Sequence, residues 1–520
     1  MIAVRYSKRW VNRELSNDMP TVVSLFTGAG GLDYGFEAAG FATRIAVEMD
    51  RDCCLTLRAN RDWPVIEGDI KATSSAAMLA AAGLRADEVD VLIGGPPCQP
   101  FSKSGYWATG DTKRLADPRA STVEHYMRCV RDFLPRVFVL ENVPGFNYAK
   151  KSEGFELVRR ATEEINRECG TQYMLSHATL NVADYGVPQL RTRFFLVADR
   201  DGRTFQFPAP THGGTEPGAQ LALLDLTAEP HRTAWDAIGD GLAASDEELT
   251  MRGRWADLLP SIPEGENYLW HTSRKGGLPL FGWRTRYWNF LLKLAKDQPS
   301  WTLQAQPGSA VGPFHWCNRR LSVRELGALQ TFPDTIRFIG TRNSVVSQIG
   351  NAVPSLFAEI LARSIGQQFF DLYTSTPPRL TVARRGMPPP AEPVRPVPAT
   401  YLPLLGAHLE HPGTGKGPRS EERAVEHGLD ASPGHSATHE WEYLRRRHGR
   451  CAICSHPWPQ DGDARDPHAM TAQHIIPLAE GGTNTVDNIQ LVCISCAQRP
   501  MQQEVHGFSI DRDEAVRVAV

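Results

Sequence analysis

The sequence predicts an α/β protein whose main part contains a doubly wound, largely parallel β-sheet. Between residues 20 and 200, short β-rich runs alternate with segments whose apolar residues recur at helical spacing. The β-rich runs are almost continuously apolar, as strands are when a sheet is buried on both faces. These runs are "TVVSLF", "TRIAVEM", "VDVLIGG", "RVFVLEN" and "RTRFFLVAD". Such alternation is typical of a sheet covered by helices on both sides.

The composition bounds the class of protein. A chain of 520 residues with 41% hydrophobic and 22% charged residues suggests a globular protein of two or three domains. The formal net charge of −3 gives no global signature of nucleic-acid binding, so any basic surface must be local. No apolar run approaches the roughly 18 residues that span a bilayer, and the first residues lack the apolar core of a secretory signal. We therefore expect a cytoplasmic protein with no membrane partner.

The rest of the sequence indicates further parts. The strand–helix alternation fades after about residue 205 and a coherent pattern resumes with "RRLSVRELGALQTFPD". Twelve of the 38 prolines then fall between Pro377 and Pro433 without apolar periodicity, which predicts a linker in an extended or disordered state. Ten cysteines in a chain of this length do not suggest a disulfide scaffold. The residues after the linker are predicted to form a separate small module.

A glycine-rich turn follows the first predicted strand, in "VVSLFTGAGGLDYGF". Gly28, Gly30 and Gly31 would let the backbone approach a ligand at the positive end of the next helix. Their spacing fits G-x-G-G and not the dinucleotide pattern G-x-G-x-x-G, so alone it is a weak signal. Glu48 ends the next strand, where an acidic residue commonly binds ribose hydroxyls, and Asp69 follows a possible third strand. A nucleoside-containing cofactor is favoured.

Cys98 stands in "GGPPCQPFS", directly after the buried run "VDVLIGG". Open α/β sheets bind ligands at the carboxyl ends of their strands, and the prolines make this stretch stiff and non-helical. A thiol held rigidly there is positioned as a nucleophile would be. A structural cysteine in a Pro-rich turn fits the same stretch.

Six motifs together resemble those of the DNA cytosine-5 methyltransferase family, in that family's order, between residues 20 and 370. "SLFTGAGG" resembles the first cofactor motif, "GGPPCQPFS" the catalytic-cysteine motif and "ENV", residues 141–143, the motif that recognises the target base. "QLRTR" resembles the Q-x-R-x-R motif, and "RRLSVRELGALQTFP" and "QIGNAVP" resemble the last two motifs. One departure is Ser24, where many members carry Asp.

The resemblance implies a Rossmann-like domain that methylates carbon 5 of cytosine in a specific double-stranded DNA sequence, using S-adenosyl-L-methionine. Cys98 would add as a thiolate to carbon 6 of a base flipped out of the duplex. Glu141 would donate to ring N3, while Arg191 and Arg193 would hold O2 and the neighbouring loop. The cofactor-binding residues would be Phe26, Thr27, Gly28, Gly30, Gly31, Leu32, Glu48, Met49, Asp69, Ile70, Pro96, Asn351 and Ala352.

The resemblance also divides the chain. Residues 1–204 and 301–370 would form the two parts of the catalytic domain, with a target-recognition region inserted at residues 205–300. A linker at 371–439 and a zinc module at 440–510 would follow. In "TSRKGGLPLFGWRTRYW" basic and aromatic residues are interleaved, which suits contacts to guanine edges and phosphates, although ordinary surface residues fit too. The DNA-recognition candidates are Arg274, Lys275, Arg284 and Arg286.

Two C-x-x-C pairs near the C-terminus, Cys451 with Cys454 and Cys493 with Cys496, indicate a structural tetrahedral Zn²⁺. Between the first pair and Cys493, "QHIIPLAEGGTNTVDNIQLVC" resembles the HNH nuclease motif, which implies a small ββα module. By position in that motif, His474 would activate water with the help of a divalent metal ion, and Asn488 would orient the loop.

Two residues depart from the HNH pattern. Gln473 stands where Asp or His usually binds the catalytic metal, and Ala497 stands where His is usual. An amide and a methyl group cannot hold Mg²⁺ in the usual way. We therefore expect a weak or inactive nuclease, retained to bind DNA or a partner, unless Asp487 or His506 supplies a substitute ligand.

Two alternative functions stay open from the sequence. One is a DNA endonuclease or nickase that acts through the HNH-like module, and the other is a tRNA cytosine-5 methyltransferase, since a tRNA-modifying branch shares the motifs. The sizeable recognition insert and the nuclease-like tail both favour DNA. We expect a monomer in a restriction-modification or host-defence system, in the bacterial cytoplasm and associated with the nucleoid, with a cognate restriction enzyme as a candidate partner.

Overall fold

The computed structural model of the chain forms two compact units, residues 1–410 and 411–520. In the first unit the structure describes residues 19–97, 121–147, 153–213, 228–239, 248–282 and 287–407. In the second it describes residues 451, 454, 470–474, 489–493 and 496. Cys98, Arg284, Arg286 and Asn488 lie outside the described residues, and of His474 only the backbone is described.

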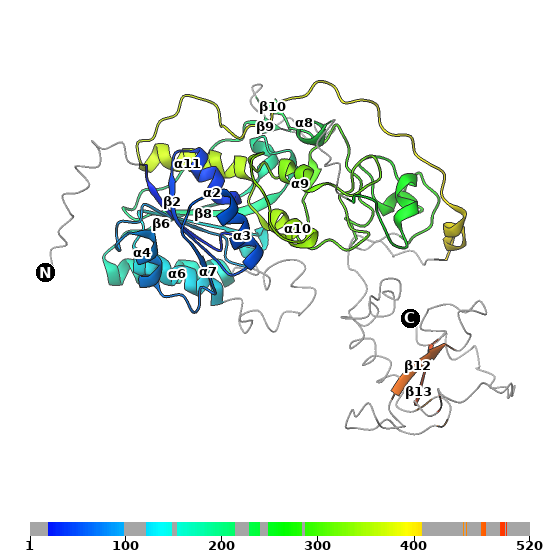
Figure 1. The fold of residues 1–520 in the computed structure, drawn as a ribbon, viewed down its shortest axis with the longest axis horizontal. Coiled ribbons are helices and arrows are strands. Elements are labelled where there is room, and N and C mark those ends of the chain that lie inside the picture. Colours follow the sequence, from blue (N-terminus) through cyan, green and yellow to red (C-terminus); the bar gives the residue numbers. More distant parts are fainter. Residues whose placement is uncertain are drawn as a thin grey trace, which may run out of the picture. The chain divides into compact units, whose positions relative to one another are not determined.

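A seven-stranded sheet forms the centre of the first unit (Figure 1), with the order β3-β2-β1-β4-β5-β8-β6. Its strands are β1 (Thr21–Leu25), β2 (Ala42–Glu48), β3 (Val65–Glu67), β4 (Val91–Gly94), β5 (Val137–Asn142), β6 (Met174–Asn181) and β8 (Thr192–Asp199). The pairs from β3 to β5 are parallel, whereas β8 runs antiparallel to both β5 and β6. The predicted α/β fold with a parallel-dominant sheet is confirmed.

One face of the sheet is covered by three helices. Val23 and Leu92 point to this face and pack with apolar residues of α4 (Ser75–Ala82), α6 (Ser121–Phe133) and α7 (Glu153–Cys169). Successive side chains of a strand point to opposite faces, so their sequence neighbours must be buried on the other side.

The opposite face is covered by α2 (Gly31–Ala38) and α11 (Ser355–Phe369), which pack against Val22 and Val91. Helix α11 lies directly on α2, because a Cβ at Gly35 would be 2.3 Å from the Cβ of Ala358. A sheet covered on both faces explains why the central strands are almost continuously apolar.

A third apolar core joins the last motifs to the catalytic sheet. Helices α8 (Ala234–Ile238), α9 (Val323–Leu329) and α10 (Arg342–Asn351) contribute to it, together with Tyr34 of α2. The remaining elements of the sheet domain are α3 (Arg51–Asn60), η3 (Pro144–Asn147), η4 (Val182–Tyr185), β7 (Gln189–Leu190), β9 (His212–Gly213), β10 (Glu229–Pro230) and β11 (Ser300–Trp301). Strand β7 pairs with β11, which ties the "QLRTR" segment to the chain that follows the recognition region.

A fourth apolar core is built mainly from the region predicted to recognise the target, residues 205–300, and we call it the recognition core. Its buried members are Met251, Trp255, Leu258, Leu259, Ile262, Tyr268, Leu269, Leu280, Leu291, Ala310, Phe314 and Tyr401. They are carried by η5 (Ala256–Ser261), η6 (Tyr268–His271), the loops around them and η7 (Ala399–Leu404). Tyr401 therefore comes from a part of the chain that composition assigned to a linker.

The stretch Arg342–Phe369 is long and apolar enough to span a membrane by length and composition alone. However, 72% of its most apolar 18-residue segment is buried within the protein, as expected of core helices. Among the described residues it is the one stretch that passes this test.

In the second unit, β12 (Met470–His474) and β13 (Ile489–Cys493) form an antiparallel pair. Met470 lies opposite Cys493, and His474 lies opposite Ile489. This pair carries both the predicted nuclease base and one of the predicted zinc ligands.

Candidate active site and zinc cluster

A cleft of about 1440 Å³ opens in the first unit at the carboxyl ends of β1, β2, β4 and β5. Open α/β sheets bind ligands at this edge. The opposite wall is formed by residues 303–314, by α9 and α10, and by the turn between α10 and α11. The first and the last of the six motifs therefore line one cavity.

The glycine-rich loop between β1 and α2 forms part of the cleft wall. Its backbone is left-handed at Phe26, Gly28 and Gly30, with φ values of 53°, 56° and 85°. Gly31 packs so tightly that a Cβ there would lie 2.4 Å from the carbonyl oxygen of Val353. The loop thus brings bare backbone and the positive end of α2 to the cleft.

The Glu48 carboxylate is fixed beside this loop by three backbone N–H groups. Oε2 accepts from Gly28 at 2.7 Å, and Oε1 accepts from Met49 and Asp50 at 2.8 Å each. Burial raises the pKa of Glu48, against the opposing effect of these hydrogen bonds. An acceptor is therefore held in place at the carboxyl end of β2.

Every residue predicted to bind the cofactor lines the cleft except Gly30, which caps α2. The lining members of that set are Phe26, Thr27, Gly28, Gly31, Leu32, Glu48, Met49, Asp69, Ile70, Pro96, Asn351 and Ala352. They come from both walls of the cavity.

Glu141 and Arg193 form an ion pair at the same edge of the sheet. Arg193 Nε lies 3.2 Å from Glu141 Oε1, and the two side chains are only 15% and 13% exposed. Burial raises the pKa of Glu141, while Arg193 and Arg191 act in the opposite direction. A carboxyl group whose neutral form is favoured by burial can donate a hydrogen bond to a ligand.

The backbone that leads to Cys98 passes directly over this carboxyl group and is held from two sides. A Cβ on Gly95 would lie 3.0 Å from Glu141 Oε2. Asn142 Nδ2 donates to the carbonyl oxygen of Pro96 at 3.2 Å, and Thr122 Oγ1 donates to that of Pro97 at 3.3 Å. These bonds fix the chain up to the residue before Cys98, which is itself outside the described part.

Arg191 is almost fully buried behind the ion pair and also lines the cleft. Its Nη2 donates to the carbonyl oxygen of Gly350 at 2.9 Å. Within the described part of the chain, Nε and Nη1 have no hydrogen-bond partner. Burial lowers the pKa of Arg191 well below its usual value, Arg193 lowers it further, and Glu141 opposes both. Arg191 therefore ties the "QLRTR" segment to the last motif.

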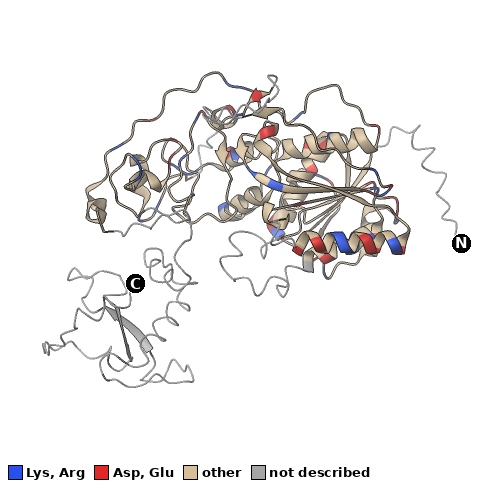
Figure 2. Cartoon of the chain, turned by 180° about the vertical axis from the view of Figure 1, so that it is seen from behind, with Lys and Arg blue, Asp and Glu red and all other residues tan. Residues whose placement is uncertain are grey.

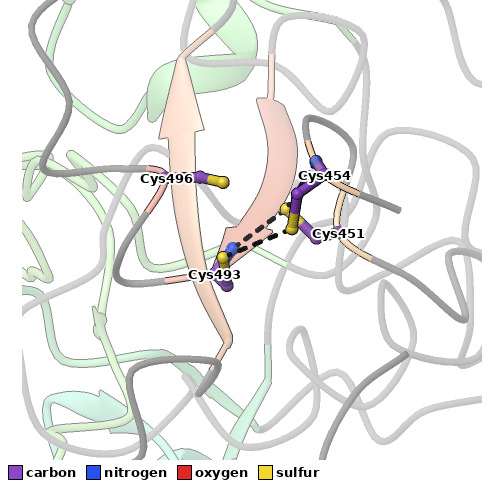
Figure 3. A group of neighbouring side chains, drawn as sticks. All are labelled: Cys451, Cys454, Cys493 and Cys496. Carbon is purple, nitrogen blue, oxygen red and sulfur yellow. Dashed lines mark hydrogen bonds between the residues drawn. The ribbon is translucent and has the colours of Figure 1, made fainter. Parts of the chain in front are cut away.

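In the second unit, the four cysteines of the two C-x-x-C pairs converge (Figure 3), with all sulfur atoms within 4.8 Å of one another. The Sγ atoms of Cys454 and Cys493 lie 3.7 Å apart, which matches the sulfur separation of about 3.7 Å expected for tetrahedral Zn–S bonds of about 2.3 Å. The N–H groups of Cys454 and Cys493 donate to Cys451 Sγ at 3.5 and 3.3 Å. This cluster could bind zinc.

Comparison with known proteins now identifies the family. Residues 20–367 match the C-5 cytosine-specific DNA methylases. The chain belongs to this family. Residues 451–509 match an HNH endonuclease family. The resemblances inferred from the six motifs and from the C-terminal cysteine and histidine pattern are both confirmed, and with them the enzyme class of cytosine-5 methyltransferase.

This DNA methylase aligns with most of the length of its curated relatives. Type II methyltransferase M.SacI of Streptomyces achromogenes is 38% identical over 377 residues, which is 68% of this chain and 94% of M.SacI. Type II methyltransferase M.AquIA of Picosynechococcus sp. is 45% identical over 222 residues, 42% of this chain and 87% of M.AquIA. Type II methyltransferase M1.HphI of Haemophilus parahaemolyticus is 33% identical over 355 residues, 66% of this chain and 86% of M1.HphI.

The candidate DNA-recognition residues of the methylase are described only in part. Arg274 is exposed, whereas Lys275 Nζ is bound to the Glu266 carboxylate at 2.8 and 3.0 Å. Phe281 packs on Trp255 in the recognition core, so it stabilises that core. Basic and acidic residues are mixed along the described ribbon and do not form one continuous basic stretch (Figure 2).

Sequence reasoning missed two glutamines that join the walls of the cleft. Gln189 is fully buried; its Nε2 donates to Gln330 Oε1 at 2.6 Å, and its Oε1 accepts from the N–H of Leu303 at 3.1 Å. Gln330 in turn donates to the carbonyl oxygens of Ile349 and Ala352 at 2.7 and 2.9 Å. Gln189 lies in the motif "QLRTR" and Gln330 in "RRLSVRELGALQTFP". Membership of these motifs was the one sign in the sequence that the two glutamines matter.

Asp33, in the first turn of α2, was also missed. It is fully buried, lines the cleft, and neither carboxyl oxygen accepts a hydrogen bond of normal geometry from the described residues. Burial raises the pKa of Asp33 to about 7, against a weaker effect of Ser24. The sequence motifs do not show that Asp33 is buried, because the burial of a single acidic residue depends on tertiary packing.

Proposed function

We propose that this methylase transfers a methyl group from S-adenosyl-L-methionine to carbon 5 of cytosine in a specific double-stranded DNA sequence. The observation that carries the proposal is the continuity of one cleft from the glycine-rich loop and Glu48 to the Glu141–Arg193 pair. A cofactor bound at the first end would have its reactive group directed toward a base held at the second.

The residues at the first end fit such a cofactor. Glu48 offers a fixed acceptor for ribose hydroxyls, Asp69 lies two residues beyond β3, and the glycine-rich loop before α2 lets a ligand approach the backbone closely. Bound S-adenosyl-L-methionine would supply an electrophilic methyl group. Met49 is 68% exposed, which leaves its side chain available to pack against an adenine ring.

The residues at the second end suit activation of cytosine, whose carbon 5 is a poor nucleophile. The Cys98 thiolate would form a bond to carbon 6, while Glu141 in its protonated form donates to ring N3 and offsets the charge that develops. Arg193 would hold both Glu141 and O2, and Arg191 would support the neighbouring loop. After carbon 5 accepts the methyl group, loss of the C5 proton and of the thiolate restores the aromatic ring.

This chemistry requires the base to leave the stack, because the ring faces are covered inside a duplex. Extrusion costs a few kcal/mol, offset by contacts in the cleft and along the DNA. We assign those outer contacts to the region of residues 205–300, with Arg274, Lys275, Arg284 and Arg286 as candidates. Because Lys275 already pairs with Glu266, it would have to exchange that partner for a phosphate.

The relatives named Type II methyltransferases support a role in restriction-modification. We propose that the chain acts as a monomer in the bacterial cytoplasm and protects DNA sites that a separate restriction enzyme would otherwise cut. The domain limits given for the catalytic domain, linker and zinc module are part of this proposal.

Tritium release from duplex DNA that contains [5-³H]cytosine tests the transfer, with Cys98→Ser as the comparison. We expect release from the parent protein and none from the variant, and equal release from both would end the proposal. Bisulfite sequencing of host DNA from cells that express the protein would return activity and target site together.

For the C-terminal module we propose structural zinc without efficient cleavage. The four convergent sulfur atoms favour a metal, whereas Gln473 and the missing histidine at Ala497 disfavour a catalytic Mg²⁺ site. A plasmid nicking assay with Mg²⁺ or Mn²⁺ tests this. Cleavage that disappears in His474→Ala would show that the module is an active nuclease.

A further inference from the structure

Residues 378–404, which we call the strap, lie beyond the last methylase motif and beyond residues 20–367 that match the family. Figure 1 shows this segment as a yellow trace that leaves α11 and reaches η7 at the recognition region. The segment is extended up to η7. It makes four sets of contacts on the way.

The first anchor is on the catalytic sheet domain. Glu359 of α11 is fully buried, and its carboxylate accepts from the N–H groups of Arg379 and Leu380 at 2.7 and 2.9 Å. Arg363, one helical turn further on, pairs with Glu359 at 2.7 Å and donates to the carbonyl oxygens of Thr376 and Pro377. The start of the strap is therefore fixed to α11.

The second anchor is on α8, which belongs to the third apolar core. Asp236 accepts from the backbone N–H of Arg385 at 2.8 Å, and the carbonyl oxygen of Asp236 accepts from Arg385 Nε at 2.9 Å. The same carboxylate closes the capping box of α8 with Thr233. The strap thus binds to the N-terminal end of α8, which the capping box already holds in place.

The third anchor is a buried lysine, Lys296. Lys296 Nζ donates to Glu264 at 2.7 Å, to the carbonyl oxygen of Pro390 at 3.0 Å and to Glu392 at 3.3 Å. The backbone N–H of Glu392 also donates to Glu264 at 2.8 Å. Burial alone would lower the pKa of Lys296, but Glu264 and Glu392 outweigh it and raise that pKa. Glu392, which belongs to the strap, thus helps to hold the buried ammonium group in its charged form.

The fourth anchor is inside the recognition core. Arg395 N–H donates to the carbonyl oxygen of Pro260 at 3.0 Å. The ring of Tyr401 stacks on Trp255 with centroids 5.8 Å apart, and its hydroxyl donates to the carbonyl oxygen of Arg254 at 2.6 Å. The end of the strap is therefore an integral part of this core.

The chain between the second and fourth anchors is stiff. It contains Pro388, Pro389, Pro390, Pro393, Pro396 and Pro398. Pro-rich segments favour the extended polyproline II conformation and act as semi-rigid spacers, whereas Gly-rich ones do not fix a distance. A stiff segment fastened at both ends holds those ends at one separation.

We propose that the strap is a positioning segment that sets the distance between the catalytic sheet domain and the recognition core, and so holds the two surfaces that duplex DNA must contact together. This rests on the proposed function, since it is the DNA that must fit both surfaces. If the separation between the catalytic sheet domain and the recognition core is fixed in advance, DNA binding does not have to order them and avoids that entropic cost.

The test replaces Pro388, Pro389 and Pro393 by Gly, which loosens the strap between its anchors and keeps all anchor side chains. The matched control replaces Pro412, Pro418 and Pro433 by Gly, three prolines that follow the last anchor in the sequence. Affinity is measured for a duplex that carries the site found by bisulfite sequencing, or for fragmented genomic DNA if no site is found. Thermal stability and affinity for S-adenosylhomocysteine are measured alongside.

We expect the loosened strap to weaken duplex binding by roughly 5- to 20-fold, with unchanged cofactor affinity and unchanged melting temperature relative to the control. When methyl transfer is measured, KM for DNA should rise while kcat at saturating DNA stays the same. Equal duplex affinity of the two variants would overturn the proposal. A large fall in melting temperature only in the strap variant would also overturn it, because the strap would then be needed for folding. If the parent protein transfers no methyl group, the proposed function fails, but the affinity ratio still decides the role of the strap.

Discussion

The buried carboxyl group of Asp33 gives the stability of the cofactor-free protein a pH dependence that can be measured. In the folded chain burial raises the pKa of Asp33 to about 7 from its usual 3.8. Between these values the folded state keeps a proton that the unfolded state has lost. The stability contributed by the protonated group is fully present below pH 4 and is lost as the pH rises through 7.

The size of the effect follows from the width of this window. Well inside it, each pH step of one changes the free energy of unfolding by about 1.4 kcal/mol, and the change flattens near pH 7, so roughly 2 kcal/mol should be lost between pH 5 and pH 7. Asp33→Asn carries no titrating group at this position. The free energy of unfolding of the parent minus that of Asp33→Asn should therefore fall by roughly 2 kcal/mol between pH 5 and pH 7. Glu48 and Glu141 are present in both proteins and cancel in the difference.

Urea unfolding at several pH values between 5 and 8, followed by tryptophan fluorescence, measures this difference. Glu153→Gln, which removes an exposed carboxylate at the start of α7, is the control. A difference between parent and Asp33→Asn that stays constant across the window would refute the reasoning. It would mean that Asp33 finds a hydrogen-bond donor or a cation in the folded state.

Three further predictions concern the cleft and the cluster. Gly31→Ala places a Cβ 2.4 Å from the carbonyl oxygen of Val353 and should weaken S-adenosylhomocysteine binding by at least about tenfold by calorimetry. Gly386→Ala, which lies outside the cleft lining and whose Cβ would meet nothing within 4 Å, should bind normally. Equal losses in the two variants would contradict the packing argument. Asn142→Ala removes the hydrogen bond to the carbonyl oxygen of Pro96. It should lower kcat by roughly 10- to 100-fold with little change in cofactor affinity. An unchanged kcat would show that Cys98 does not need this hydrogen bond to be positioned. Cys451→Ser should abolish the one equivalent of zinc expected per chain by mass spectrometry of the metal, and retained zinc would mean that the four thiols are not the ligands.

Most of the sheet could be predicted from the sequence because its central strands are buried on both faces. Five of the seven strands correspond to quoted apolar runs. Strand β6 was missed, since it lies at the edge of the sheet and only one of its eight residues, Ser176, is buried. The antiparallel direction of β8 could not be predicted either, because a continuous apolar run does not indicate the direction of a strand in the sheet.

The site was predictable where a motif fixes the residue types, and less so where packing decides. The glycines, Glu48 and the Glu141–Arg193 pair could be named from their motifs. The role of Asn142 was not seen, although it sits next to Glu141, because its bond to Pro96 joins two strands far apart in sequence. Prolines predicted an extended segment after residue 370, but the partners of Glu392 and Tyr401 depend on tertiary contacts that composition cannot show.

The most direct measurement is covalent trapping on a duplex that contains 5-fluorocytosine at the target position. If a sulfur atom adds to the base and the methyl group is transferred, the fluorine cannot leave as a proton does, and enzyme and DNA stay joined. With S-adenosyl-L-methionine present we predict a complex that survives denaturing electrophoresis and maps to Cys98 by peptide sequencing. If no joined species forms, or if Cys98→Ala forms it as well, the account of this site is contradicted.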